Sequence, residues 1–284
     1  MPLYDNELKA IAEIAVHAGD LVHSLYGTVE RLTKTHSAAN QEAVTEADRK
    51  SQALIVGELR RRFPGDGIIG EEDDTGSGIT VECPNPEGRV WVIDPIDGTN
   101  NFIAGFDNFA VCIGLMEAGM PVCGVVYDVI RRRLYSGAVG HGVTVDGRPT
   151  ACLTTPMGDS SVVLLTSNVL DAGKQLHPFV SRWMGQTNWK IRVIGSAALE
   201  AAYVAAGIAH AAVTVNGKLW DVAAPAALVL AAGGKIISMD GKPLFPFDLR
   251  GYSGAKVPFL ATGPAAADEM VKQVNTPVPF LPPR

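Results

Sequence analysis

An apolar strand that runs straight into two carboxylates is the feature that most constrains how this chain can fold. Residues 90–93 read Val-Trp-Val-Ile, a run that suits a fully buried strand, and Asp94 follows at once. Pro95 has no N–H to give to a neighbouring strand, so pairing is predicted to stop there. Asp97 comes three residues after Asp94, and a Gly-Thr pair then opens a predicted helix. The segment therefore predicts two carboxylates beside the unpaired N–H groups of a helix start.

Such a pair of carboxylates suggests a metal site next to a phosphate site. Carboxylates that are crowded together repel one another and need a cation, and hard oxygen ligands favour Mg²⁺ or Mn²⁺. The N–H groups at a helix start bind anions. On its own, however, an Asp before Gly-Thr is often only a helix cap or a turn, so this segment alone leaves a purely structural interpretation open.

Two further acidic clusters lie at predicted element ends. Glu71 and Glu72 follow a short predicted strand at residues 68–70, and Asp221 opens a predicted Ala-rich helix far along the chain. If these carboxylates belong to one site with Asp94 and Asp97, that site joins the two halves of the chain. Glu72 supports Glu71 or faces solvent, and the sequence does not decide between the two.

The remaining pattern predicts alternating helices and sheets, with a change in composition near residue 150. Residues 33–42 and 73–88 are predicted as loops, and Ala118-Gly119 as the turn of a hairpin. Helices are predicted over residues 5–26, 46–63, 176–184, 197–206, 221–232 and 265–274, and strands over 68–70, 90–94, 109–116, 121–129, 134–138, 162–166, 211–215, 236–239 and 259–262.

Composition excludes several classes of function. The net charge is −6 and the longest basic run is the triplet 131–133, which argues against nucleic-acid binding. The four cysteines form no Cys-x-x-Cys pair, which favours free thiols in a reducing compartment. No signal peptide and no apolar run long enough for a membrane span is recognisable, so cytoplasmic residence is expected. The P-loop, dinucleotide-binding and Gly-x-Ser-x-Gly motifs are missing.

Taken together, the motifs resemble those of the inositol monophosphatase family, the lithium-sensitive and magnesium-dependent phosphatases. The resemblance runs in the right order over roughly residues 5 to 275. It rests on Val44-Thr45-Glu46-Ala47-Asp48, Gly70-Glu71-Glu72, the segment from Trp91 to Phe102, Trp220-Asp221-Val222-Ala223-Ala224-Pro225 and Ala231-Ala232-Gly233-Gly234.

The resemblance implies a fold and an assembly. The fold class is α+β, a layered αβαβα sandwich as in the inositol monophosphatase and fructose-1,6-bisphosphatase superfamily. Residues 1–150 would form an N-terminal half with two long helices, an antiparallel sheet and most of the metal ligands. Residues 151–284 would form a half with a mixed sheet that supplies Asp221 and substrate contacts. A homodimer is implied as well.

The resemblance also implies a role for each site residue, with two to three Mg²⁺ per site and Mn²⁺ as an alternative. The first metal would bind Glu71, Asp94 and the carbonyl of Ile96; the second would bind Asp94, Asp97 and Asp221; a third, weaker site would use Glu71 with waters. Thr99 and Glu71 would activate the attacking water, and Asp48 would orient Thr99. Substrate contacts are expected from Asp97, Gly98, Thr99, Gly195, Ser196 and Asp221.

The sequence departs from the family at the position that reads the substrate. Inositol-specific members carry a Glu about seven residues before the second-motif Asp, where this chain has Thr214. Lys218 and Asn216 offer hydrogen-bond donors instead. A basic residue is also expected before the Val-Thr-x-x-Asp motif, and Lys34 lies near that place but out of register. Inositol monophosphate is therefore expected to be a moderate substrate at best. The alternatives are fructose-1,6-bisphosphatase, 3′(2′),5′-bisphosphate nucleotidase or histidinol-phosphatase activity, or a catalytically idle binding or regulatory protein.

Overall fold

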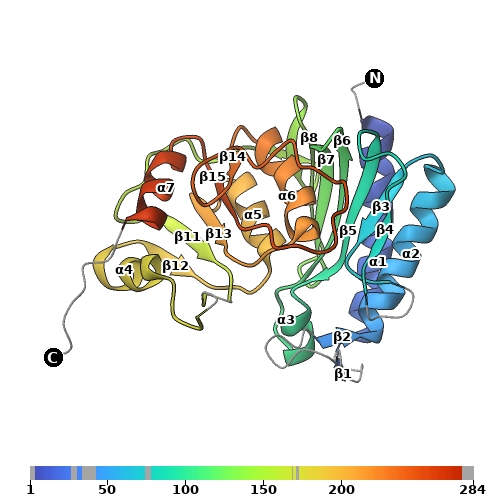
Figure 1. Cartoon of the computed structure of the whole chain (residues 1–284), viewed down its shortest axis with the longest axis horizontal. Coiled ribbons are helices and arrows are strands. Elements are labelled where there is room, and N and C mark those ends of the chain that lie inside the picture. The colour runs from blue at the N-terminus through green and yellow to red at the C-terminus, as the bar shows by residue number, and fades with distance from the viewer. Residues whose placement is uncertain are drawn as a thin grey trace.

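Three layers of helices and two β-sheets alternate along the long axis of the molecule (Figure 1). The computed structural model describes residues 4–26, 31–33, 43–73, 78–167, 169–170 and 173–276. From one end the layers are α1 with α2, the eight-stranded sheet, α5 with α6, the five-stranded sheet, and α4 with α7 (Figure 1). The expected αβαβα sandwich is confirmed.

The eight-stranded sheet carries two of the three acidic clusters. Its neighbours pair antiparallel except for β3 and β5, which run parallel, so this sheet is mixed rather than purely antiparallel as predicted. The predicted hairpin is confirmed: Ala118 and Gly119 turn with φ of 48° and 73°, the left-handed pair that a two-residue hairpin needs. The strand order is β10 (Arg148–Thr150), β9 (Gly142–Val145), β8 (Arg133–Ala138), β7 (Met120–Asp128), β6 (Ala110–Glu117), β5 (Arg89–Asp97), β3 (Gly67–Gly70) and β4 (Thr80–Glu82).

Two long helices cover the outer face of this sheet. α1 (Asp5–Leu25) places Ile11, Ile14 and Val22 against the sheet at helical spacing, and all three side chains are fully buried. Burial of such a side chain stabilises the fold by about 1.5–3 kcal/mol. α2 (Glu46–Arg62) lies beside α1 and ends just before Pro64, which cannot continue a helix. A small separate sheet pairs β1 (Arg31–Thr33) with β2 (Ala43–Thr45).

The five-stranded sheet belongs entirely to the second half of the chain. Its first three strands run parallel, and β15 pairs antiparallel with both of its neighbours. α4 (Pro178–Gln186) and α7 (Ala267–Asn275) cover its outer face (Figure 1). The strand order is β12 (Lys190–Arg192), β11 (Val162–Leu165), β13 (Ala211–Thr214), β15 (Phe259–Thr262) and β14 (Lys235–Ile237).

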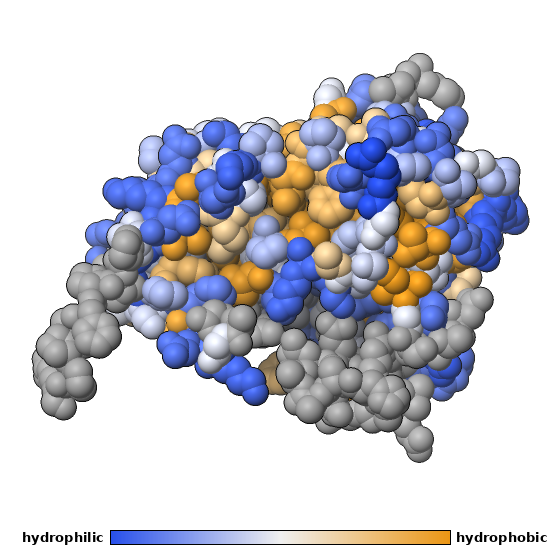
Figure 2. Space-filling model, in the orientation of Figure 1, coloured by the Kyte–Doolittle hydropathy of each residue, from blue (hydrophilic) through white to orange (hydrophobic). Residues whose placement is uncertain are grey.

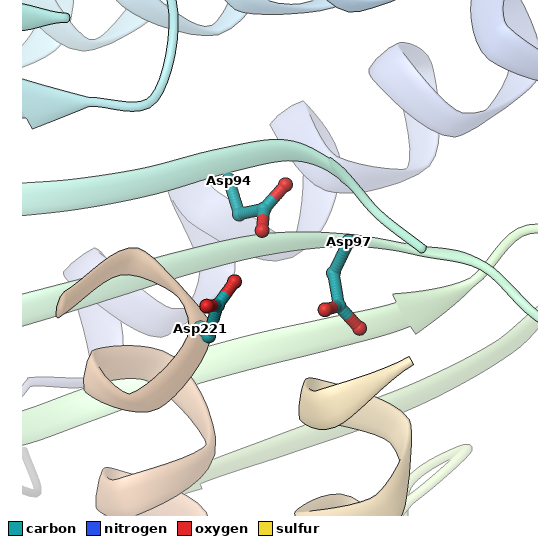
Figure 3. Close-up of side chains that lie close together, drawn as sticks. All are labelled: Asp94, Asp97 and Asp221. Carbon is teal, nitrogen blue, oxygen red and sulfur yellow. The ribbon is translucent and has the colours of Figure 1, made fainter. Parts of the chain in front are cut away.

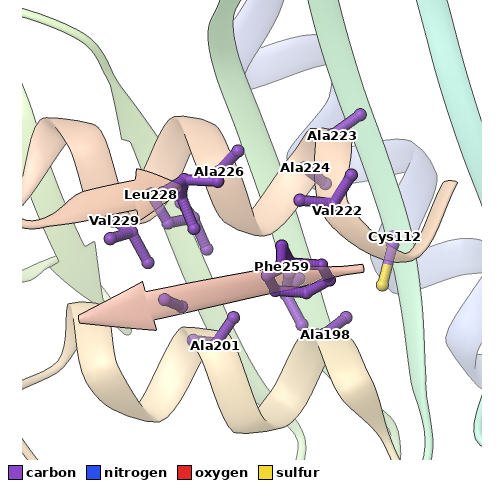
Figure 4. Packing of buried hydrophobic residues seen from close by; sticks show 14 of the residues in the cluster. Cys112, Ala198, Ala201, Val222, Ala223, Ala224, Ala226, Leu228, Val229 and Phe259 are labelled. Atoms are coloured by element: carbon purple, nitrogen blue, oxygen red, sulfur yellow. The ribbon is translucent and has the colours of Figure 1, made fainter. Parts of the chain in front are cut away.

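The middle layer consists of two Ala-rich helices that both sheets contact. α5 (Ala197–Ala205) and α6 (Leu219–Ala231) pack against each other, and their small side chains meet Phe259 and Cys112 from the two sheets (Figure 4). Apolar residues also gather over the middle of the face in Figure 2. Small side chains let the helices approach the sheets closely, and this closeness brings the first residues of both helices to the acidic end of β5.

A pair of glycines seats α6 on the eight-stranded sheet. Gly114 and Gly124 lie opposite each other on β6 and β7. A Cβ at Gly114 would lie 2.7 Å from the backbone nitrogen of Ala224, and one at Gly124 would lie 2.8 Å from the Ala224 carbonyl oxygen. Any side chain at either position would therefore push α6 away from the sheet.

The structure corrects several predicted boundaries. β5 does not stop at Pro95 but resumes pairing at Asp97. The segment 73–88 contains the short strand β4, and β9, β10 and β12 were not predicted; each has only three or four residues, too few for a clear alternation. Lys34 and most of the predicted loop 33–42 lie outside the described residues. Among the described helices, none has the length and apolar character needed to cross a membrane.

Candidate active site

A β-bulge at the end of β5 puts Asp94 and Asp97 on the same face. In a regular strand, residues three apart point to opposite faces. Here Asp94 pairs with Cys112 and Asp97 pairs with Ala110, so β5 has one more residue than β6 between these pairs. Asp94 Oδ1 accepts the N–H of Ile96 at 3.0 Å, which stabilises the bulge around Pro95. Proline thus interrupts the ladder as predicted, but its consequence is a bulge rather than the end of the strand.

The first turn of α6 brings the third carboxylate to the same place. One carboxylate oxygen from each of Asp94, Asp97 and Asp221 lies within 4.8 Å of the other two (Figure 3). Asp94 and Asp97 are 1% and 5% exposed, and Asp221 is half-buried. Asp221 Oδ2 accepts the N–H of Lys218 at 2.7 Å, which orients its side chain at the helix start. Residues from the two halves of the chain therefore meet in one site.

Glu71 lies beside this group of three. It follows β3, the parallel neighbour of β5, and its N–H donates to the carbonyl of Ile93 at 3.3 Å. Its charge contributes to the field at Asp94. Glu72, which the sequence left undecided, is 2% exposed and therefore points inward rather than to solvent.

The three carboxylates cannot all remain ionised together unless a cation is bound. Burial raises the pKa of Asp94 well above its usual range, and the charges of Glu71, Asp97 and Asp221 raise it further. Asp94 and Asp221 lie within hydrogen-bond reach of each other, which requires a proton or a cation between them. Burial, followed by the charge of Asp221, raises the pKa of Asp97 to about 7. An all-oxygen, multiply charged cluster of this kind fits a hard divalent cation.

The N-terminus of α5 holds Asp97 in place. Ser196 Oγ donates to Asp97 Oδ2, and the N–H groups of Ala197 and Ala198 donate to the same carboxylate at 3.2 and 3.0 Å. Ser196 also caps α5 by accepting the N–H of Leu199 at 3.3 Å. Ser196 is 1% exposed and its hydroxyl is engaged with Asp97, while its expected contact with substrate stays a prediction. A Ser before an Ala-rich helix was the available signal for this cap.

Thr99 begins α3 (Thr99–Ala104), directly after the bulge. Its hydroxyl lies 3.2 Å from Asp48 Oδ1 on α2 and 2.9 Å from the carbonyl of Ile96. Asp48 is 1% exposed, so the predicted pair of Thr99 and Asp48 does meet in space. Gly98 turns the chain with φ of 95°, and a Cβ there would lie 2.9 Å from the Asn108 carbonyl oxygen, so only glycine fits.

Two residues that sequence reasoning missed connect the loops of the site. Asn101 Nδ2 donates to the carbonyls of Asn108 and Ile194, both at 2.7 Å, and so joins the loop after α3 to the loop before α5. Glu200 Oε1 accepts the N–H groups of Ile194 and Gly195 at 3.2 and 3.3 Å, and burial raises its pKa to about 8. Gly195 has φ of 77°, so this turn also favours glycine. Asn101 lay inside the recognised motif, but its spacing gave no hint of its two acceptors.

The residues at which a departure from inositol-specific members is expected from the sequence lie around the start of α6. Thr214 ends β13 and is 1% exposed, and its hydroxyl has no hydrogen-bond partner among the described residues. Lys218 Nζ lies 5.1 Å from the ring centroid of Trp220, a cation–π contact. A Cβ on Gly217 would lie 2.7 Å from the Thr214 methyl group, so this turn packs closely against position 214.

Comparison with known proteins agrees with this geometry. The chain matches the family described as "Inositol monophosphatase family" over residues 4–275. The fructose-1,6-bisphosphatase/inositol-1-monophosphatase of Thermotoga maritima is 34% identical over 280 residues, covering 97% of this chain and 96% of that protein.

Solved structures share the fold. A Thermotoga maritima IMPase superimposes with a TM-score of 0.79 at 31% identity and covers 95% of this chain and 97% of its own. An IMPase/NADP phosphatase in complex with Mg²⁺ and phosphate has a TM-score of 0.77 and covers 95% of both chains; at 22% identity it shows the fold alone. The match over nearly the whole chain and the acidic site lead to one conclusion: this chain belongs to the inositol monophosphatase family of phosphoric monoester hydrolases.

Proposed function

We propose that this protein is a Mg²⁺-dependent phosphomonoesterase that hydrolyses a small phosphorylated polyol or a related metabolite by attack of an activated water. The observation that carries the proposal is the meeting of Asp94, Asp97 and Asp221 within 4.8 Å in a buried site. Such a cluster has little structural use, because mutual repulsion destabilises the fold unless a cation is bound. A relative of the same fold bound to Mg²⁺ and phosphate supports the choice of metal.

The metal ligands follow from the donor set. Asp94, Asp97 and Asp221 would hold a divalent cation directly, and Asp94 would be shared with a second cation held by Glu71 and the Ile96 carbonyl. That carbonyl already accepts the Thr99 hydroxyl and keeps one lone pair for a metal. A third cation would bind Glu71 through waters. When bound, these ions neutralise the phosphate charge and lower the pKa of water.

The other residues position the reacting groups. Thr99 and Glu71 would together activate the attacking water, and Asp48, whose Oδ1 lies 3.2 Å from the Thr99 hydroxyl, would orient Thr99. The N–H groups of Gly98 and Thr99, at the start of α3, would bind the phosphate oxygens. The hydrogen bonds from the N-terminus of α5 keep the Asp97 side chain from rotating. Gly195 and Ser196, just before this helix, would contact the substrate.

The substrate is expected to be other than inositol monophosphate alone. Thr214 cannot accept hydrogen bonds as a charged carboxylate does, and its burial and the close packing of Gly217 leave its hydroxyl far from solvent. Losing a charged acceptor for two inositol hydroxyls reduces the preference for inositol monophosphate over other phosphate esters by about 1.5–3 kcal/mol. A sugar bisphosphate is favoured, since a 34% identical relative is described as a fructose-1,6-bisphosphatase as well as an inositol monophosphatase. Nucleotide 3′-phosphates and histidinol phosphate are the other candidates.

We also propose a cytoplasmic homodimer and a division of function between residues 1–150 and 151–284. The boundary would fall between β10, the last strand of the first sheet, and β11, the first in sequence of the second. Under this division most metal ligands belong to the first half, and Asp221 to the second.

A phosphate-release assay tests the proposed function. Purified protein is incubated with inositol-1-phosphate, fructose-1,6-bisphosphate, a 3′-phosphorylated nucleotide and histidinol phosphate, each with Mg²⁺ and with a chelator. We expect Mg²⁺-dependent turnover of at least one ester and none with the chelator. If metal binds but no ester turns over, the binding or regulatory alternative is favoured instead.

A further inference from the structure

We propose that Gln52, on α2, is a positioning residue that sets Glu71 for metal binding. The inference rests on the proposed function, because it assigns a support to one of the proposed ligands. Gln52 is 4% exposed and lies one helical turn after Asp48, on the α2 face that looks toward the site. Its neighbour Ser51 donates to the carbonyl of Pro95 at 3.0 Å, so the same face also supports the bulge.

Gln52 holds the backbone of Glu72 from both sides. Its Oε1 accepts the N–H of Glu72 at 3.0 Å, and its Nε2 donates to the carbonyl of Glu72. Nε2 also donates to Thr80 Oγ1 at 3.3 Å, and that hydroxyl in turn donates to the Glu72 carbonyl at 2.7 Å. The side-chain amide therefore pairs with the peptide groups of residue 72 as a strand would.

Only an amide satisfies this arrangement. A peptide N–H can only donate and a peptide carbonyl can only accept, so the two contacts fix which end of the Gln52 amide is oxygen. A carboxylate at position 52 would still accept the N–H of Glu72, but its second oxygen would face the Glu72 carbonyl, acceptor against acceptor. An apolar side chain would leave the buried N–H of Glu72 without the acceptor that it has here, although the Glu72 carbonyl would keep the N–H and the hydroxyl of Thr80 as donors.

The clamp acts on Glu71 because it fixes the peptide that follows it. The N–H of Glu71 is bonded to Ile93 on β5, and the next N–H along the chain is bonded to Gln52. With both flanking peptides fixed, the point at which the Glu71 side chain leaves the backbone is fixed as well, close enough to Asp94 for its charge to act there. Gly70 makes room for the clamp: a Cβ there would lie 2.7 Å from Gln52 Oε1, so the glycine of the Gly-Glu-Glu motif is needed for this contact.

Metal binding without substrate tests the inference. Mn²⁺ is titrated into wild type, Gln52→Glu and Gln52→Met, and free Mn²⁺ is followed by electron paramagnetic resonance. The matched control is Ala53→Glu, which adds the same charge at the next residue of α2, on an exposed position. Thermal unfolding of each variant in chelator shows that it is folded at the assay temperature, and two unlike substitutions guard against one that fails to fold.

We expect both Gln52 variants to bind Mn²⁺ about tenfold more weakly than wild type, as for other supports of metal ligands, and Ala53→Glu to bind as wild type does. The Mg²⁺ concentration for half-maximal phosphate release should rise by a similar factor. Wild-type Mn²⁺ affinity in both folded Gln52 variants would overturn the inference while leaving the proposed function intact. Absence of Mn²⁺ binding in wild type would instead overturn the proposed metal site, and the role of Gln52 with it.

Discussion

Gly114→Ala should loosen α6 and so disturb the active site from a distance. The added methyl group would lie 2.7 Å from the backbone nitrogen of Ala224 and 2.9 Å from its Cα. Non-bonded carbon atoms prefer about 3.5–4.0 Å, so α6 must retreat by roughly 1 Å at this point. Backbone atoms cannot escape by changing rotamer, and the five-stranded sheet limits how far the helix can move.

The expected magnitude follows from overpacking. Inserting a methyl group into a filled core costs about 1–3 kcal/mol, which for a chain of this size lowers Tm by about 2–12 °C. Asp221 lies three residues before Ala224 on the same helix, so the shift also moves a proposed metal ligand. A misplacement of about 1 Å reduces turnover on the order of a hundredfold.

Thermal unfolding and phosphate release measure the two effects, with Gly57→Ala as the control. Gly57 is an exposed residue of α2, and a Cβ there would meet nothing within 4 Å. In a helix interior this change should stabilise the protein by about 0.5–1 kcal/mol. The same substitution is thus expected to act with opposite sign at the two positions. A Gly114→Ala protein with unchanged Tm and unchanged kcat would refute the close seating of α6.

Four further outcomes are expected. Asp94→Asn should leave less than a tenth of the activity at saturating Mg²⁺, yet raise the Tm of the metal-free protein, because it removes one charge from the repelling cluster. In chelator, the free energy of unfolding should fall as pH rises from about 4 to about 7. Folding raises the pKa of Asp97 from 3.8 to about 7, so the folded state binds this proton more tightly than the unfolded state does. A Tm that stays constant over this pH range would contradict the expectation. Millimolar Li⁺ should inhibit phosphate release uncompetitively or noncompetitively, and full activity far above that range would place the chain among insensitive relatives. Lys218→Ala should change kcat/KM for the preferred ester more than for inositol-1-phosphate; a tenfold preference for inositol-1-phosphate that the variant leaves unchanged would disprove altered specificity.

The sequence predicted which carboxylates meet better than it predicted what supports them. Asp94, Asp97 and Asp221 stood at element ends within recognisable motifs, and the structure brings them together. The contacts that orient them come from distant segments: the α5 terminus for Asp97 and Gln52 for the segment after Glu71. Such pairings depend on tertiary packing, and residue spacing along the chain carries no record of them.

The fold shows the same division between local and distant determinants. Long helices and buried strands were predicted because their apolar periodicity extends over many residues. β4, β9, β10 and β12 were missed because three or four residues show no periodicity, and each is defined by the neighbour with which it pairs. The bulge in β5 belongs to this second group, since only the register against β6 reveals the additional residue.

The position of Asp221 on α6 has a consequence for how the protein folds and unfolds. The proposed cation site is complete only when α6 has docked between the two sheets, because Asp94 and Asp97 come from β5 and Asp221 from a helix much later in the chain. A folding transition state in which α6 has not yet docked offers no complete site. Bound cation therefore stabilises the native state but not that transition state, so it slows unfolding and leaves the folding rate nearly unchanged. Cation loading thus lengthens the lifetime of the assembled protein without directing its assembly.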